Sequence, residues 1–285
     1  GAMRFAGRNA LVIAETALAL VLLAGSGLML RSLGKLRGTD PGVDVEQVLT
    51  LRFARTARVG ADSVHGTYEQ LLERVRALPG VTAAGLSNCP PLGGGCNGTS
   101  VTRRDRPPVA PGMEPEVAVH WLSPGFPEAM RIPLVRGRLF DSRDQRGARK
   151  AVLVNETAAR KIWPGEDPLG KPVSVGQGGF HDDTALVVGI VGDVRYASMS
   201  APPEASVYLP YSQSPLAGTM LFVRTAGDPV SVAPAVRRTL REIAPDFPVY
   251  DLRTMEERAA ESLGYARFTT LLLAVFGALA LALAT

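Results

Sequence analysis

An apolar run near the start of the chain most constrains what the chain folds into. Residues 10–30 read ALVIAETALALVLLAGSGLML and carry one ionisable side chain, Glu15. About 20 mostly apolar residues span a hydrocarbon core of roughly 30 Å as a helix. The apolar regions of signal peptides are shorter, about 7–15 residues. We therefore predict a transmembrane helix over residues 9–33, after a leader or cleavage scar at residues 1–8.

A second apolar run, TLLLAVFGALALALA, begins at Thr270 near the other end of the chain. No charged residue follows Arg267, which is typical of a membrane span. We interpret residues 255–285 as a stalk followed by the truncated start of the next transmembrane helix. The segment between the two runs is then held at a membrane by both of its ends.

Polar and small residues within these runs indicate where the helices make contacts. Glu15 is either a packing contact with another span or part of a mechanism, because charges inside a membrane are costly. Both interpretations stay open. Gly25, Gly27 and Gly277 allow close helix approach, and we expect them at stalk-packing positions.

The composition of the remaining chain excludes some classes of function. About 230 residues lie between the apolar ends, enough for one large or two small domains. The formal net charge is only +4, and the Lys and Arg residues are scattered. We therefore expect no nucleic-acid partner. The RRDR stretch at residues 103–106 sits among prolines and is interpreted as a solvated loop.

A strand-helix-strand pattern occurs twice in the chain, once after the first apolar run and once before the second. Apolar periodicity predicts strands, amphipathic helices capped by Asp62 and Asp228, and second strands. The two units can pair into one split αβ sandwich with both helices on one face. This subdomain comprises residues 40–92 and 218–254. The predicted strands and helices cover residues 49–57, 62–78, 81–86, 220–226, 228–243 and 247–252.

The residues between these units, 93–217, form a predicted insertion that is mostly β. Short apolar segments alternate with Gly and Pro turns. A short helix is expected from the cap Asn155 to Trp163. The fold class is therefore α+β: a membrane-proximal sandwich with an inserted β-rich subdomain, flanked by transmembrane helices. The strands expected in the insertion cover residues 117–121, 151–154, 173–175 and 184–194.

The sequence contains no recognisable catalytic or cofactor motif. It has no GxxxxGK[ST] loop, and the glycines of PLGGGCNG, residues 91–98, precede no helix start or lysine. We interpret that segment as a flexible link. Cys89 and Cys96 do not have the spacing of zinc or redox pairs, so a disulfide and two unpaired thiols both stay open.

Histidine spacing likewise gives no support for a metal site. His65, His120 and His181 are far apart in sequence, and the acidic pair after His181 is more typical of a solvated loop. We therefore expect no catalytic, cofactor-binding or metal-binding residues, and no enzyme activity.

Four phrases carry a family resemblance. They resemble the MacB-like periplasmic core domain of FtsX-family ABC permeases, and most closely the second unit of the acidobacterial-type duplicated orphan permeases. The phrases are DPGVDVEQVLTLRF at residues 40–53, LSPGFPEAMRIPLVRGRLF at 122–140, VLVNETAARKIWPGEDPLGKPV at 152–173 and VVGIVGDVRY at 187–196.

The resemblance implies a porter-like subdomain outside the cytoplasm of a bacterial inner-membrane permease. It implies that a separate cytoplasmic ABC ATPase drives motion that the outer domain relays, in efflux or in mechanotransmission. Further implied partners are the other half of a duplicated permease or a homodimer mate, and a periplasmic adaptor or substrate protein. The alternative function is a membrane-bound sensor that transmits a ligand signal. The substrate stays open.

Overall fold

The computed structural model describes residues 17, 20–31, 34, 38–54, 61–107, 109–110, 112–177, 180, 183–214, 218–262 and 264–284. The chain divides into two compact units. One unit, the head, is residues 41–259, and the other comprises residues 1–40 and 260–285. The predicted leader at residues 1–8 and the predicted intramembrane residue Glu15 lie outside the described residues.

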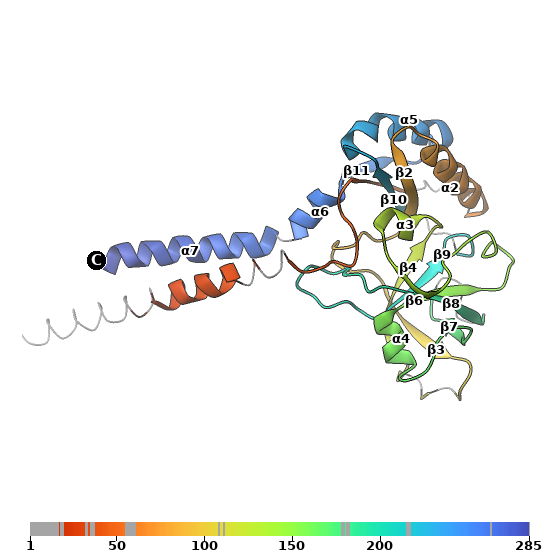
Figure 1. The fold of residues 1–285 in the computed structure, drawn as a ribbon, viewed down its shortest axis with the longest axis horizontal. Coiled ribbons are helices and arrows are strands. Elements are labelled where there is room, and N and C mark those ends of the chain that lie inside the picture. The colour runs from red at the N-terminus through yellow and green to blue at the C-terminus, as the bar shows by residue number, and fades with distance from the viewer. Residues whose placement is uncertain are drawn as a thin grey trace, which may run out of the picture. The chain divides into compact units, whose positions relative to one another are not determined.

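The head is an α+β unit with a mixed sheet and helices (Figure 1). Its elements, in chain order, are β1 Val48–Ala54, α2 Ala61–Arg76, β2 Val81–Ser87, β3 Gly98–Arg103, β4 Glu116–Leu122, α3 Phe126–Met130, β5 Leu134–Gly137, β6 Ala151–Asn155, α4 Glu156–Ile162, β7 Pro172–Val175, β8 Ala185–Val191, β9 Ser206–Pro210, β10 Gly218–Thr225, the 3-10 turn η1 Pro229–Val232, α5 Ala233–Ile243 and β11 Val249–Thr254. Helix α6, Met255–Ser262, leads out of the head, and α7 covers Gly264–Ala284.

The two predicted strand-helix-strand units pair as expected. Their strands lie in the order β11-β1-β10-β2, and every neighbouring pair is antiparallel. Helices α2 and α5 contact each other and pack with these strands in one apolar core. We call this part the αβ region: β1, β2, β10, β11, α2, η1 and α5. Both of its helices lie beside one another in Figure 1.

Capping and apolar spacing explain the second helix of the pair. The Asp228 carboxylate accepts a hydrogen bond from the Val230 backbone N at 2.9 Å, and Pro229 occupies the first turn. Val236 and Leu240, one turn apart, are fully buried. Helix α2 begins at Ala61, so Asp62 lies inside its first turn and the prediction of Asp62 as the cap is wrong.

The remaining strands, β3 to β9 with α3 and α4, form the inserted region. The sequence predicted β4, β6, β7 and β8, and it predicted α4 with Asn155 as its cap. The structure adds β3, β5 and β9. Strand β4 is parallel to β9, and β6 is parallel to β8. These strands are short and pair at long range, so local periodicity carries little signal for them.

The two regions share one core. Strand β2 meets β4 where Ser87 pairs with Leu122. One cluster of buried side chains includes Leu71 of α2 together with Val152 of β6. The head therefore packs as one body, and the subdomain boundaries predicted near residues 92 and 217 stay a prediction.

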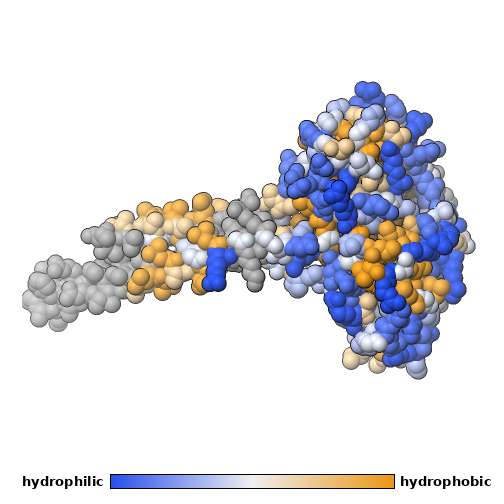
Figure 2. Space-filling view, viewed as in Figure 1, coloured by the Kyte–Doolittle hydropathy of each residue, from blue (hydrophilic) through white to orange (hydrophobic). Residues whose placement is uncertain are grey.

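The terminal unit contains helical residues 20–31 and α7. Its described surface is largely apolar (Figure 2). Among the described residues, no helix combines the length and hydropathy needed to cross a bilayer. The exposed apolar side chains are Leu20, Val21, Leu23, Leu28, Met29 and Leu30 on the first helix, and Phe268, Leu271, Leu272, Val275, Phe276 and Leu279 on the second.

The three glycines named for helix packing differ in their surroundings. A Cβ added to Gly277 would lie 3.3 Å from Leu23 Cδ2 and 3.6 Å from the Leu23 backbone N. The two helices therefore approach closely there. No atom lies within 4 Å of a Cβ added to Gly25 or Gly27. A packing function for those two glycines stays a prediction that needs a further helix as partner.

Candidate functional site

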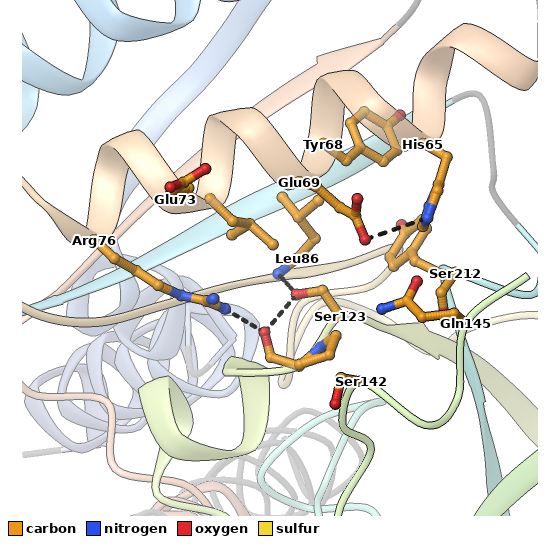
Figure 3. A pocket seen from close by; sticks show the side chains of 13 residues that line it. His65, Tyr68, Glu69, Glu73, Arg76, Leu86, Ser123, Ser142, Gln145 and Ser212 are labelled. Atoms are coloured by element: carbon orange, nitrogen blue, oxygen red, sulfur yellow. Dashed lines mark hydrogen bonds and ion pairs between the residues drawn. The ribbon is translucent and has the colours of Figure 1, made fainter.

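A cavity of about 390 Å³ lies between helix α2 of the αβ region and loops of the inserted region (Figure 3). Helix α2 lines one side, Leu86 of β2 lies behind it, and three loops close the other side. Apolar and aromatic walls with a few polar groups are typical of ligand pockets. The lining residues are His65, Tyr68, Glu69, Leu72, Glu73, Arg76, Leu86, Ser123, Pro124, Ser142, Gln145, Tyr211 and Ser212.

Arg76 fixes one end of this cavity. Its Nε and Nη2 donate to the Ala84 carbonyl at 3.0 and 2.8 Å, and Nη2 also donates to the Pro124 carbonyl. Burial lowers the pKa of Arg76 from its ordinary value, and the charge of Glu128 opposes that shift. The guanidinium thus ties α2 to β2 and to the loop after β4, which holds the two regions together.

Ser123, one of three serines in the cavity wall, is engaged in structural hydrogen bonds. Ser123 Oγ accepts from the Leu86 backbone N at 2.7 Å and donates to the Pro124 carbonyl at 3.2 Å. Its proton is therefore directed at the backbone rather than at a catalytic base. His65 Nε2 lies 3.3 Å from Glu69 Oε1 along one face of α2. This arrangement favours binding of a small amphipathic group over catalysis.

An aromatic wall closes the cavity on the side of Tyr211. The rings of Tyr68 and Tyr211 meet edge to face with centroids 5.7 Å apart. The Tyr211 hydroxyl donates to Thr219 Oγ1, which in turn donates to the Ser87 carbonyl at 3.1 Å. Burial raises the pKa of Tyr211 above its ordinary value, so this hydroxyl stays protonated.

Helix α6 joins β11 through a reciprocal cap. The Glu257 carboxylate accepts from the Thr254 backbone N at 2.8 Å, and the Glu257 backbone N donates to Thr254 Oγ1 at 3.1 Å. This pattern is a capping box. Met255, the first residue of α6, is fully buried in the core of the head. The start of α6 is therefore fixed to the sheet.

Arg258 locks the same helix onto β1 and β11. Its Nε donates to Thr50 Oγ1 at 2.7 Å, and its Nη2 donates to the carbonyl and the carboxylate of Asp251 at 2.9 and 2.8 Å. The Arg258 side chain is only 10% exposed. Burial lowers the pKa of Arg258, and its hydrogen bond to Asp251 opposes that shift. We call Thr50, Asp251, Thr254, Glu257 and Arg258 the α6 joint.

An irregularity in β11 aims Asp251 at this arginine. The pairing of β11 with β1 shifts register between Thr50 and Arg52, and Asp251 has φ +56°. A bulge of this kind turns a side chain out of the regular alternation. Partial burial raises the pKa of Asp251, but the hydrogen bond and the charge of Arg258 outweigh it and leave the pKa low. The carboxylate is therefore charged in the joint.

The RRDR stretch is not simply a solvated loop, as the sequence had suggested. Arg103 ends β3 and is only 13% exposed, with its Nη2 2.7 Å from Asp105 and 3.0 Å from Glu166. Lys171 Nζ lies 3.1 and 3.0 Å from the same two carboxylates. Hydrogen bonds from Arg103 lower the pKa of Glu166 to about 2. Residues 104–106 are exposed and lie in a bend, as the sequence predicted. The prediction missed the ion pairs of Arg103, because Glu166 and Lys171 lie over 60 residues away.

The segment interpreted as a flexible link is hydrogen-bonded to a neighbouring loop. The backbone N of Leu92 donates to Arg195 O at 2.9 Å, and the N of Gly94 donates to Ala197 O at 3.1 Å. Gly94 has φ +98°, which favours glycine. The glycines therefore build a defined turn, and the prediction of a flexible link is wrong.

This turn carries the two cysteines, which are joined by a disulfide. The His120 imidazole of β4 lies beside them, and one ligand atom from each of Cys89, Cys96 and His120 lies within 4.8 Å of the others. Burial lowers the pKa of His120 to about 3, so its imidazole is neutral. Sequence spacing had missed this cluster because strand pairing, not local sequence, brings His120 to the turn. His181 lies outside the described residues.

Sequence comparison identifies a known family and one curated relative. The sequence profile of the MacB-like periplasmic core domain matches residues 10–242. The chain is 28% identical over 91 residues to the macrolide export ATP-binding/permease protein MacB of Marinobacter nauticus. That match covers 32% of this chain and 13% of the relative, so the chain spans only a small part of that protein.

Two solved structures match much of this chain at low sequence identity. The periplasmic region of MacB from Actinobacillus actinomycetemcomitans matches with a TM-score of 0.49 and 15% identity over 78% of this chain and 95% of that one. The extracellular domain of the noncanonic ABC-type transporter YknZ from Gram-positive bacteria matches with a TM-score of 0.41 and 14% identity over 71% of this chain and all of that one. This chain belongs to the MacB-like periplasmic core domain family.

Proposed function

We propose that this chain is the extracytoplasmic part, with its flanking membrane segments, of a permease in the bacterial inner membrane that relays movement driven by a cytoplasmic ABC ATPase. The family match supports the permease class. The exposed apolar side chains of the two terminal helices support contact with lipid or with further spans (Figure 2). In this proposal a separate partner hydrolyses ATP, which agrees with the lack of a GxxxxGK[ST] loop in this sequence.

One observation supports this transmission of movement. The strand that follows the first terminal helix and the strand that precedes the second are hydrogen-bonded neighbours. Strand β1 follows the first helix, β11 leads into α6 and α7, and β1 pairs with β11 from Leu49 with Thr254 to Phe53 with Val249. Movement of either terminal helix is therefore applied to the same edge of the sheet. The α6 joint makes that connection stiff, because Arg258 bonds to both strands.

The head then moves as one body rather than by sliding of its halves. Both regions contribute to one apolar core, and Arg76 of α2, which bonds twice to Ala84 O of β2, reaches the inserted region through one hydrogen bond to Pro124 O. A packed core resists continuous deformation, so rigid-body motion about a joint is the low-cost response. The partners in this proposal are the ATPase, the other half of a duplicated permease or a second copy, and a periplasmic adaptor or substrate protein.

Labelling from outside the cell tests the location, and co-purification tests the partner. In the full-length permease, a cysteine at the exposed position of Glu242 reacts with a membrane-impermeant maleimide in intact cells, because α5 faces the outside. Leu240→Cys, two residues away and fully buried, is the matched control and stays unlabelled. We expect an ABC ATPase to co-purify with the permease. Labelling of the Glu242→Cys variant only after lysis, or purification without an ATPase, contradicts the proposal.

A ligand sensor is the second candidate, and the cavity between the two regions favours it. A volume of about 390 Å³ with aromatic walls suits a small molecule. A sensor would bind its ligand without any ATPase in the purified complex. Thermal shift of the full-length protein against periplasmic small-molecule extracts, with Tyr68→Ala as the cavity variant, separates the two functions.

A further inference from the structure

The turn that carries the two cysteines lies against a histidine with unusual surroundings. His120 is fully buried, and neither of its ring nitrogens has a hydrogen-bond partner among the described residues. Its ring stacks on Tyr196 with centroids 3.7 Å apart and on Tyr208 at 5.2 Å. Buried polar atoms are normally hydrogen-bonded, so two unsatisfied nitrogens in one side chain call for an explanation.

The sulfur atoms of Cys89 and Cys96 lie close to the imidazole of His120. One nitrogen of His120 and the Sγ atoms of Cys89 and Cys96 all lie within 4.8 Å of one another. Typical metal bonds are about 2.3 Å to sulfur and about 2.0 Å to imidazole nitrogen. Ligand atoms around one metal are therefore roughly 3.5–4 Å apart at those bond lengths. Small side-chain rotations bring the three atoms into that range once the sulfurs are free.

We propose that Cys89, Cys96 and His120 form a binding site for Cu(I) when the disulfide is reduced. Thiolate and imidazole donors favour soft cations, and Cu(I) accepts three ligands. Zn²⁺ in structural sites takes four protein ligands, and the cluster supplies three among the described residues. The stacked tyrosine rings leave little room for the water shell of a hard cation such as Mg²⁺.

The surroundings hold the ligands in place after reduction. The Leu92 backbone N bonds to Arg195 O at 2.9 Å, and the Val119 backbone N bonds to Asn97 O at 2.9 Å, so both ends of the turn stay attached. Asn88 Nδ2 donates to Cys89 Sγ at 3.4 Å, while its Oδ1 accepts from the Trp121 backbone N at 2.9 Å. Such outer contacts orient ligands and stabilise thiolate charge.

A path for the ion exists as well. Both cysteines are partly exposed, and a surface cavity of about 390 Å³ is lined by Cys96, Gly98 and Glu116. A dithiol reductant opens the site: its two thiols give two electrons and two protons to the disulfide, which becomes two thiols, and the reductant leaves as a disulfide. Binding of Cu(I) then releases the two thiol protons to solvent. The site does not depend on the permease function.

The test uses the full chain, reduced with a phosphine under nitrogen and freed of reductant. Cu(I) is supplied as its bicinchoninate complex, and transfer of Cu(I) to the protein is measured. We expect one Cu(I) per chain for the reduced protein and none for the oxidised protein. His120→Phe keeps an aromatic ring in the stack and should weaken Cu(I) binding at least tenfold. His65→Gln, outside the cluster, is the matched control and should bind as the unchanged chain does.

X-ray absorption of the reduced, Cu(I)-loaded unchanged chain decides the ligand set even where His120→Phe does not fold. We expect two sulfur atoms and one nitrogen around the copper. A reduced chain that binds Cu(I) no more tightly than the Cys89→Ser, Cys96→Ser double variant overturns the proposal. Sulfur-only coordination or equal affinity of the His120→Phe variant also overturns it. Zn²⁺ and Mg²⁺ titrations complete the series, and tighter binding of Zn²⁺ than of Cu(I) contradicts the chosen ion.

Discussion

The αβ region and the inserted region are stabilised in different ways. In the αβ region, four antiparallel strands are covered by two amphipathic helices over a largely apolar core, which also holds the buried Arg224 of β10. The inserted region mixes parallel and antiparallel pairs, and charged groups join its loops. Arg103 there bridges Asp105 and Glu166, and Arg138 lies 2.6 Å from the buried Asp144. Both regions have apolar cores, and the inserted region adds ion pairs that join its loops.

In the proposed function, the two regions have different tasks. The αβ region would carry force, because it connects to both terminal helices at neighbouring strands. The inserted region has no chain connection to those helices except through the αβ region. Its loops line the far side of the cavity. We interpret the αβ region as the part that receives movement from the terminal helices. We interpret the inserted region as the part that presents the loops of the cavity.

The largest effect is expected where the two regions touch. A Cβ added to Gly85 of β2 would lie 2.2 Å from the Phe126 backbone N of α3, and backbone cannot give way cheaply. Gly85→Ala should lower the free energy of unfolding of the head by about 3 kcal/mol, the upper range for overpacking. Denaturant titration measures it. Gly98→Ala, with no atom within 4 Å, is the control and should stay within about 0.5 kcal/mol. Equal effects of both variants would mean that the regions do not pack at Gly85.

The next effect concerns the α6 joint. Arg258→Met removes hydrogen bonds to Thr50 and Asp251 and leaves the Asp251 carboxylate with fewer partners. We expect a loss of about 2 kcal/mol, less than for a fully buried pair because Asp251 is 23% exposed. Arg253→Met is the control. Its side chain is 39% exposed, and a loss below about 1 kcal/mol is expected. A larger loss for Arg253→Met than for Arg258→Met would show that the α6 joint does not stabilise the head as described.

A smaller effect on stability is expected from two glycine substitutions, one in each region. Gly66 lies on the exposed face of α2 with no atom within 4 Å of an added Cβ. Gly66→Ala should raise the melting temperature, corresponding to about 0.5–1 kcal/mol of helix propensity. Gly147 of the inserted region is equally uncrowded but has φ +85°, so Gly147→Ala should destabilise by about 1 kcal/mol. The same sign for both variants would contradict the assigned backbone conformations.

The smallest effect is the acid response of the charge cluster. The pKa of Glu166 is about 2 in the folded protein, below its ordinary value of 4.5, chiefly through hydrogen bonds from Arg103. A lowered folded pKa contributes stability above pH 4.5 that is lost as the pH falls toward 2. The unchanged chain should therefore lose stability more steeply across that window than Glu166→Gln. Parallel curves from pH 5 to pH 2 would show that the carboxylate is not held by Arg103 in solution.

Local patterns predicted the αβ region better than the inserted region, for a physical reason. Helix and strand periods, with caps such as Asn155 and Asp228, are written in neighbouring residues. Strands such as β5 have four residues, all exposed, and carry no such period. The partners of Arg103, Arg258 and His120 are set by tertiary contacts between distant segments. No spacing rule could have found them.

The central proposal is that the head, with the start of α6 locked to its sheet, moves as one body relative to α7 when ATP is hydrolysed. Spin-label distances in the full-length permease, reconstituted with its ATPase, test it most directly. One label pair replaces Glu73 and Ser142 across the cavity, and the other replaces Glu242 in α5 and Ala278 in α7. The account predicts that ATP shifts the second distance distribution and leaves the first unchanged. A shift across the cavity, or no shift between α5 and α7 while ATP is hydrolysed, would contradict it.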